Sequence, residues 1–156
     1  MIKLLAMTSE HTFLLDRARR YCNYQERCIY DVKMKLLEWK ASAGAIEKII
    51  RTLEDEDYIN EERYAVSFAT GKLRNNKWGR AKIFHALMKK HIPELYVQMG
   101  LNELDEQEYI ETLKSVLASK KIDEPDTYKR NNKLVRFAVQ RGFQASLAWK
   151  VIRGEL

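Results

Sequence analysis

The sequence predicts an all-α protein built from three tandem three-helix repeats, which together form an elongated, gently curved array. Its 156 residues include only two prolines and six glycines, and so few breakers favour helices over strands joined by turns. Apolar residues recur at intervals of three, four and seven along the chain, as in helices with one buried face. Similar residues also recur 51 positions apart, which indicates repeated units.

The first repeat, approximately residues 10–58, is expected to contain three helices. Ser42 is the expected N-cap of the third helix, because its hydroxyl can accept a hydrogen bond from a backbone N–H group in the first turn. The inward residues are Leu14, Ala18, Tyr21 and Cys22 in the first helix, Ile29, Val32 and Leu36 in the second, and Ile46, Ile49, Ile50 and Leu53 in the third.

The second repeat, approximately residues 59–103, begins with Asn60 as the expected N-cap of a helix whose positive end favours the glutamates that follow. The next helix should start near Gly79. Pro93 fits the first turn of a short third helix, and Gly100 is expected to end it. The inward residues are Ala65, Phe68, Ala69 and Leu73 in the first helix, and Ile83 and Leu87 in the second.

The third repeat, approximately residues 104–156, is expected to start its first helix near Asp105. A loop at residues 122–125 should separate this helix from one that stops at Gly142, and a last helix should end at Gly154. The inward residues are Tyr109, Leu113, Val116 and Leu117, then Leu134, Phe137 and Ala138, then Leu147, Val151 and Ile152.

The repetition rests on four sets of three positions spaced 51 residues apart. The sets are Val32, Ile83 and Leu134; Leu36, Leu87 and Ala138; Trp39, Lys90 and Arg141; and Ala41, Ile92 and Phe143. A unit of this size has a marginal core, so neighbouring units should stack, and residues 1–156 are interpreted as a single repeat domain. The alternative is a compact helical bundle in which the spacing is accidental.

Basic residues are concentrated in two acid-free segments, residues 71–91 and 127–153, in a chain of net charge +6. A basic surface predicts an acidic partner, most commonly nucleic acid. The candidate binding residues are Arg74, Lys77, Arg80 and Lys82 in the second repeat, and Lys129, Lys133, Arg136 and Arg141 in the third. The first repeat mixes acids with its bases, so the later two repeats are expected to carry most of the electrostatic contact.

The position of these bases near helix starts also suggests an anion site. Arg80 and Lys82, and likewise Lys129 and Lys133, lie close to the positive end of a predicted helix, where cations are unfavourable. A phosphate or carboxylate there would gain from the side chains and from the free N–H groups of the first turn. A solvated lysine-rich face is the alternative.

Trp78 lies in the loop between the first two helices of the second repeat. It could stack on a base or on an exposed partner surface. More often such a tryptophan packs over the junction of two helices, and both interpretations stay open at this point. Trp39 and Trp149 are expected in the core or between repeats.

No constellation typical of catalysis is present, so no enzyme activity, cofactor or metal is predicted. His11, His85 and His91 have no metal-ligand spacing, and Cys22 and Cys28 are expected to be buried free thiols. The apolar run at residues 1–7 is short for a signal peptide and lacks a basic leader, and no stretch approaches a membrane span. A cytoplasmic protein is expected, without membrane contact.

Three ordered stretches of the chain resemble the RecX family of recombination regulators. They are LEDEDYINEERYA at residues 53–65 with Phe68, KLRNNKWGRAKI at residues 72–83 with Leu87 and Lys90, and Arg141-Gly142-Phe143 with Val151 and Ile152. The resemblance extends from about Leu14 to Arg153. Asp57 and His91 stand where the family usually has glycine, and Arg80 stands where proline is common.

The resemblance implies three-helix repeats and a regulatory role at the RecA recombinase. Such a protein lies in the groove of the RecA filament on single-stranded DNA. There it restrains ATP hydrolysis, strand exchange and co-protease activity, and so dampens recombination and the SOS response. A monomer that reaches single-stranded DNA through the filament is expected, with weak direct DNA binding as a further expectation.

Two other functions are compatible with the residues. Short helix pairs resemble helix-turn-helix units, so the chain could be a stand-alone DNA-binding module, with Gln144, Ser146 and Lys150 as the base-reading candidates. It could also be a helical adaptor for another protein.

Overall fold

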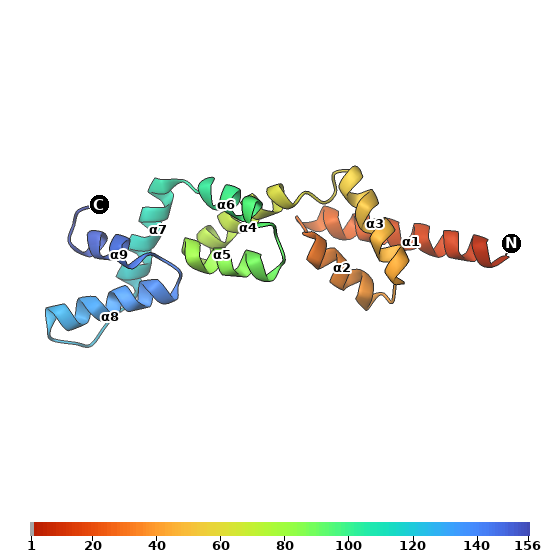
Figure 1. Ribbon diagram of the computed structural model, residues 1–156. Helices are drawn as coiled ribbons and strands as arrows, with labels where there is room; N and C mark the ends of the chain where they lie inside the picture. The colour runs from red at the N-terminus through yellow and green to blue at the C-terminus, as the bar shows by residue number, and fades with distance from the viewer. Residues whose placement is uncertain (1) are drawn as a thin grey trace. The chain divides into compact units, whose positions relative to one another are not determined.

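The computed structural model describes residues 2–156, with side chains described from Ser9 onward (Figure 1). This part of the chain forms nine α-helices and no strand, which confirms the predicted all-α class. The helices are α1 (Ile2–Tyr24), α2 (Ile29–Glu38), α3 (Ala43–Asp55), α4 (Glu61–Asn76), α5 (Arg80–Lys89), α6 (Glu94–Asn102), α7 (Glu106–Ser119), α8 (Thr127–Gln140) and α9 (Ala145–Ile152). Met1, where the expectation about a signal peptide begins, lies outside the described residues.

Two compact units make up the chain. The first extends up to Tyr64 and includes Lys90–Ile92, and the second comprises Ala65–Lys89 and Pro93–Leu156. In the first unit α1, α2 and α3 all contact one another, while in the second α5 packs on α6 and α8 packs on both α7 and α9. The three-helix repeats are therefore present, whereas the single domain, its approximate repeat boundaries and the curvature of the array stay predictions.

The first unit has a core formed by its three helices. Its buried residues are Leu14, Ala18, Cys22, Val32, Leu36, Ile46, Ile49, Leu53 and Ile59. As predicted, Ser42 caps α3: its Oγ accepts a hydrogen bond from the Ala45 N–H at 3.2 Å. Asn60 caps α4, and its Oδ1 accepts from the Arg63 N–H at 2.9 Å. Both caps satisfy an N–H group that would otherwise lack a helical partner.

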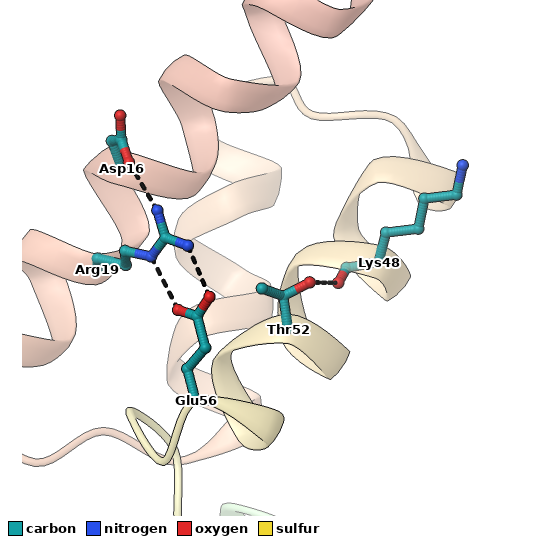
Figure 2. A network of polar contacts seen from close by, with 5 residues as sticks. All are labelled: Asp16, Arg19, Lys48, Thr52 and Glu56. Carbon is teal, nitrogen blue, oxygen red and sulfur yellow. Dashed lines mark hydrogen bonds and ion pairs between the residues drawn. The ribbon is translucent and has the colours of Figure 1, made fainter.

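A polar network joins α1 to the end of α3 (Figure 2). The Arg19 guanidinium binds both carboxylate oxygens of Glu56, at 3.0 Å and 2.8 Å, and also Asp16 Oδ1 at 2.8 Å. On α3 the Thr52 hydroxyl donates to the Lys48 carbonyl at 2.9 Å. The hydrogen bond from Arg19 lowers the pKa of Glu56. The fork geometry orients the end of α3 against α1.

The second unit buries most of the residues predicted for it. Its core includes Ala65, Ala69, Leu73, Ile83, Leu87, Val97, Leu101, Tyr109, Leu113, Val116, Leu117, Val135, Ala138 and Ala148. Asp105 caps α7, since its Oδ2 accepts from the Glu108 N–H at 2.8 Å. In α8 and α9 the prediction was partly wrong: Leu134, Phe137, Leu147, Val151 and Ile152 are half-buried, while Val135 and Ala148 are buried. Ala138 on α8 is buried as predicted, whereas Val135 and Ala148 each follow directly after a residue that was predicted to be inward.

The prediction that Gly100 ends α6 was wrong, because this glycine lies inside the helix. The helix continues to Asn102, and Pro93 is its N-cap residue instead of a member of its first turn. A Cβ atom at position 100 would lie 2.8 Å from the carbonyl of Ala65 on α4. The glycine is therefore explained by the close approach of α6 to α4, and not by a helix terminus.

The 51-residue spacing is present in the backbone itself. Lys40, His91 and Gly142 all have positive φ angles, of 62°, 58° and 97°. At Lys40 and Gly142 the preceding helix ends in the same pair of hydrogen bonds. After α2, the Ala41 N–H donates to Leu36 O at 3.0 Å and the Lys40 N–H to Leu37 O at 2.9 Å. After α8, the Phe143 N–H donates to Ala138 O at 3.1 Å and the Gly142 N–H to Val139 O at 2.9 Å. This is the Schellman arrangement of a helix C-terminus. The middle helix of each repeat thus ends in a left-handed residue.

Candidate binding surface

All eight predicted binding residues lie in the second unit. Arg74 is on α4, Lys77 follows it, Arg80 and Lys82 begin α5, and the remaining four are on α8 or at its end. Their surroundings differ sharply, so they do not form one uniform basic surface.

Arg74 and Arg80 are neutralised by glutamates of α7. Arg74 binds both carboxylate oxygens of Glu108, at 2.6 Å and 3.2 Å, and Arg80 binds Glu106 at 2.8 Å. The hydrogen bond from Arg74 lowers the pKa of Glu108. The Arg80 guanidinium also lies 4.0 Å from the centre of the Tyr109 ring. Glu106 and Glu108, which lie outside both basic segments in the sequence, therefore lie beside Arg74 and Arg80 in space.

The start of α5 is already occupied by protein groups. The Gly79 N–H donates to the Arg141 carbonyl at 2.7 Å, and the Ala81 N–H donates to the Gly142 carbonyl at 3.0 Å. The Arg80 N–H donates to the Tyr109 hydroxyl at 3.0 Å. These amides would be the donors of an anion site. The predicted anion site at this helix start was wrong, because the third repeat supplies the acceptors.

The start of α8 has protein partners at two groups. Asp126 Oδ1 accepts from the Lys129 N–H at 2.9 Å, and Lys133 forms an ion pair with Glu124 at 3.1 Å. Carboxylates of the preceding loop thus already meet one first-turn amide and Lys133, while the anion interpretation at this helix start stays a prediction. The hydrogen bond from Lys133 is the largest cause of the lowered pKa of Glu124.

Trp78 is half-buried between two lysines. The ammonium groups of Lys72 and Lys82 each lie 4.8 Å from the centre of its indole ring. Cation–π attraction explains this arrangement, and it favours the packing interpretation of Trp78. Lys77 has a left-handed backbone with a φ of 54°, and its ammonium donates to the Ser115 hydroxyl at 2.8 Å.

The remaining predicted cations are more available. Lys129 and Arg136 are exposed on α8, and Lys82 is half-buried. Among the described residues, no carboxylate forms an ion pair with any of the three. Arg141 is held at the end of α8, with its guanidinium 5.1 Å from the Phe137 ring. The structure therefore separates the eight residues into internally bound cations and three that can meet a partner.

Sequence reasoning missed a cationic surface in the first unit. Arg17 and Arg20 are exposed on α1, near Tyr21 and Tyr24. The sequence does place Arg17, Tyr21 and Tyr24 on one helix face. The acidic residues elsewhere in this repeat lower its net charge, so this face was not recognised as cationic. No group of three or more metal-binding side chains occurs within residues 9–156. None of the described helices is long and apolar enough to cross a membrane.

Comparison with known proteins places this fold in a family. A family model described as the second three-helix domain of RecX matches residues 60–101, which run from the Asn60 cap to the last turn of α6. The regulatory protein RecX of Clostridium botulinum (strain Alaska E43) is 32% identical over 114 residues, or 70% of this chain and 52% of the relative. That of Clostridium acetobutylicum is 30% identical over 130 residues, or 79% and 59%. The chain thus spans between half and three-fifths of the length of these relatives.

Solved structures share the fold. A crystal structure of RecX from Lactobacillus salivarius superposes with a TM-score of 0.83 over 94% of this chain and 97% of that chain, at 21% identity. A second crystal structure, of regulatory protein RecX, gives the same TM-score at 22% identity and covers 73% of its chain. These structures show the fold, while the match over residues 60–101 and the curated relatives mean that the chain belongs to the RecX family.

Proposed function

We propose that this chain is a regulatory protein that binds the RecA recombinase filament on single-stranded DNA and mostly inhibits its ATPase, strand-exchange and co-protease activities. The observation that carries the proposal is the match of residues 60–101 to the second RecX domain, in a chain whose relatives are named regulatory proteins. The protein would act in the cytoplasm, as a monomer, without catalysing a reaction of its own.

The available cations suggest how such binding would work. Lys82, Lys129 and Arg136 carry charge that no carboxylate of the described residues neutralises. Such charges speed the encounter with an acidic partner and set its orientation. Arg74, Arg80 and Lys133 are already paired, so in this proposal they hold the second unit together instead of meeting RecA.

A titration of the DNA-dependent ATPase of RecA tests the function. We expect the folded protein to inhibit ATP hydrolysis as it saturates the filament. The double variant Lys129→Glu/Arg136→Glu should raise the concentration for half-inhibition by about tenfold, or ~1.4 kcal/mol. The matched control is Lys114→Glu/Lys121→Glu, which makes the same charge change at two exposed positions of the same unit.

The two parts of the proposal can fail separately. No inhibition by folded wild-type protein at several-fold excess over filament sites would refute the RecA assignment. Equal inhibition by the Lys129/Arg136 variant and by the control would leave the function intact and remove α8 from the contact surface.

A stand-alone DNA-binding module is the second candidate. It requires α9 to read bases through Gln144, Ser146 and Lys150, which are exposed. The Gln144 side-chain oxygen, however, already accepts a hydrogen bond from the Tyr109 hydroxyl at 2.9 Å. Tight, sequence-selective binding of duplex DNA without RecA would favour this candidate. Salt-sensitive and unselective binding would favour the filament regulator.

A further inference from the structure

Cations and aromatic rings alternate along one surface of the first unit. The Arg17 guanidinium lies 4.1 Å from the centre of the Trp39 ring, and Trp39 meets Tyr21 edge to face at 6.2 Å. The Arg27 guanidinium lies 3.8 Å from the Tyr21 ring and 5.9 Å from the Tyr24 ring. We call this surface the arginine–aromatic ladder, and its members are Arg17, Arg20, Tyr21, Tyr24, Arg27 and Trp39.

The arginines of the ladder are not neutralised. The nearby acids have other partners: Asp16 and Glu56 bind Arg19, Glu38 binds Lys35, and Glu26 binds Arg63. Within residues 9–156, no ion pair involves Arg17, Arg20 or Arg27. Arg27 is held in place by a hydrogen bond from its Nε to the Tyr21 carbonyl at 3.2 Å. Of these three arginines, Arg17 and Arg27 lie over aromatic rings, and Arg20 is exposed on the same helix as Arg17.

The outer face of α1 continues this pattern with exposed rings. Phe13, Arg17, Arg20 and Tyr24 are separated by four, three and four residues, so they share one helix face. Tyr24 is 83% exposed and Phe13 is 59% exposed. Large rings left in water beside free arginines are not required by the core of this unit, which lies on the opposite face at Leu14, Ala18 and Cys22.

This chemistry matches single-stranded nucleic acid. Unpaired strands offer base faces that stack on exposed aromatic rings, and phosphates that bind guanidinium groups. A duplex hides its base faces. An acidic protein surface would pair with the arginines but would leave the exposed rings unused.

We infer that the arginine–aromatic ladder is a direct binding site for single-stranded nucleic acid, in which Arg17 and Arg20 contact phosphates and Tyr24 stacks on a base. The inference deepens the proposed function and rests on it for its biological setting, because it gives the chain its own contact with the strand that a recombinase filament covers. Binding itself requires no recombinase. It also assigns to the first repeat a contact that the charge distribution along the sequence had assigned to the later two.

Fluorescence anisotropy with a labelled oligothymidylate and the full chain, without RecA, tests the site. Tyr24→Ala should weaken binding by roughly 5- to 100-fold, the loss expected for one stacked base, and Tyr24→Phe should restore it. Arg17→Ala and Arg20→Ala should each reduce the slope of log K against log salt by about 0.7, the value for one phosphate contact on a single strand. A duplex of the same length should bind more weakly than the single strand.

Lys48→Ala and Arg51→Ala are the matched controls, because each removes one exposed cation of the same unit from α3, outside the ladder. Both should retain wild-type affinity and salt slope. Arg20 and Tyr24 have no partner in the core, so their variants keep the test informative if Arg17→Ala, which uncovers Trp39, perturbs folding.

Three results are decisive. Wild-type affinity and slope in Tyr24→Ala and Arg20→Ala would overturn the inference. Loss of RecA inhibition in these variants with unchanged oligonucleotide binding would also overturn it, and would make the ladder a protein-binding surface. Loss of oligonucleotide binding in a chain that never inhibits RecA would uphold the ladder and refute the proposed function.

Discussion

Replacement of Gly79 by alanine should strongly destabilise the second unit. A Cβ atom at this position would lie 2.3 Å from the carbonyl carbon of Gly142, 2.4 Å from its oxygen and 2.4 Å from the Phe143 nitrogen. Ordinary contacts of a Cβ atom begin at 3.4 Å, so the two backbone segments would have to separate by about 1 Å. Because all three neighbours are backbone atoms, no side chain can move aside.

The magnitude follows from two contributions. Overpacking of this kind costs about 1–3 kcal/mol. The separation also weakens the hydrogen bonds from Gly79 to Arg141 and from Ala81 to Gly142, each worth about 1 kcal/mol. The free energy of unfolding should fall by about 3–5 kcal/mol, which corresponds to a Tm lower by roughly 6–20 °C for a chain of this length.

Urea denaturation followed by circular dichroism measures the loss, and Gly71→Ala is the matched control. Gly71 lies inside α4, and its added Cβ would meet only the Asn75 amide nitrogen, at 3.9 Å. This control should gain about 0.5–1 kcal/mol, the usual difference between alanine and glycine in a helix. In Gly79→Ala, amide exchange at Ala81 should accelerate. If Gly79→Ala has the wild-type urea midpoint while Gly71→Ala is stabilised, the close contact described here is wrong.

Three further predictions concern buried groups. Tyr109→Phe should cost about 1–3 kcal/mol in urea denaturation, because the Arg80 N–H loses its acceptor and the Gln144 oxygen its donor; an unchanged midpoint would mean that water replaces the hydroxyl. Burial raises the pKa of Glu61 to about 7, so the contribution of Glu61 to stability should be fully present below its ordinary pKa and should be lost as the pH rises through about 7; Glu61→Gln should remove this loss, and identical pH profiles of the two proteins would contradict it. Burial also raises the pKa of the Cys28 thiol to about 12, so an aromatic disulfide reagent should react with it only after unfolding, and rapid labelling of the native protein would show that the site opens.

Local features of this fold could be predicted from the sequence. Ser42 and Asn60 cap their helices as expected, because a cap depends on one side chain and an amide three residues away. The helix expected to start near Asp105 does start there. The 51-residue spacing was also correct, since it reflects the repeated end of the middle helix at Lys40, His91 and Gly142.

Pairing between distant segments could not be predicted. Arg74 and Glu108 are 34 residues apart, and Arg80 and Glu106 are 26 apart, so the basic and acidic segments looked separate along the chain although they neutralise each other. For the same reason the start of α5 looked free for an anion, whereas Tyr109 and Gly142 fill it. The arginine–aromatic ladder, which was missed, depends on a contact between Arg17 on α1 and Trp39 at the end of α2. Each failure concerns tertiary contacts, about which periodicity carries no information.

The joint between the second and third repeats has a consequence for how this family diverges. Its hydrogen bonds run from backbone to backbone, at Gly79 to Arg141 and Ala81 to Gly142, and require little more of the side chains than that two positions stay small. In a one-dimensional array, cooperativity comes from such nearest-neighbour coupling terms. Coupling through backbone hydrogen bonds is insensitive to most side-chain substitutions elsewhere. Mutation can therefore change the outward surfaces of adjoining repeats independently without uncoupling them, which allows one repeat to keep its cations internally paired while another leaves them available to a partner.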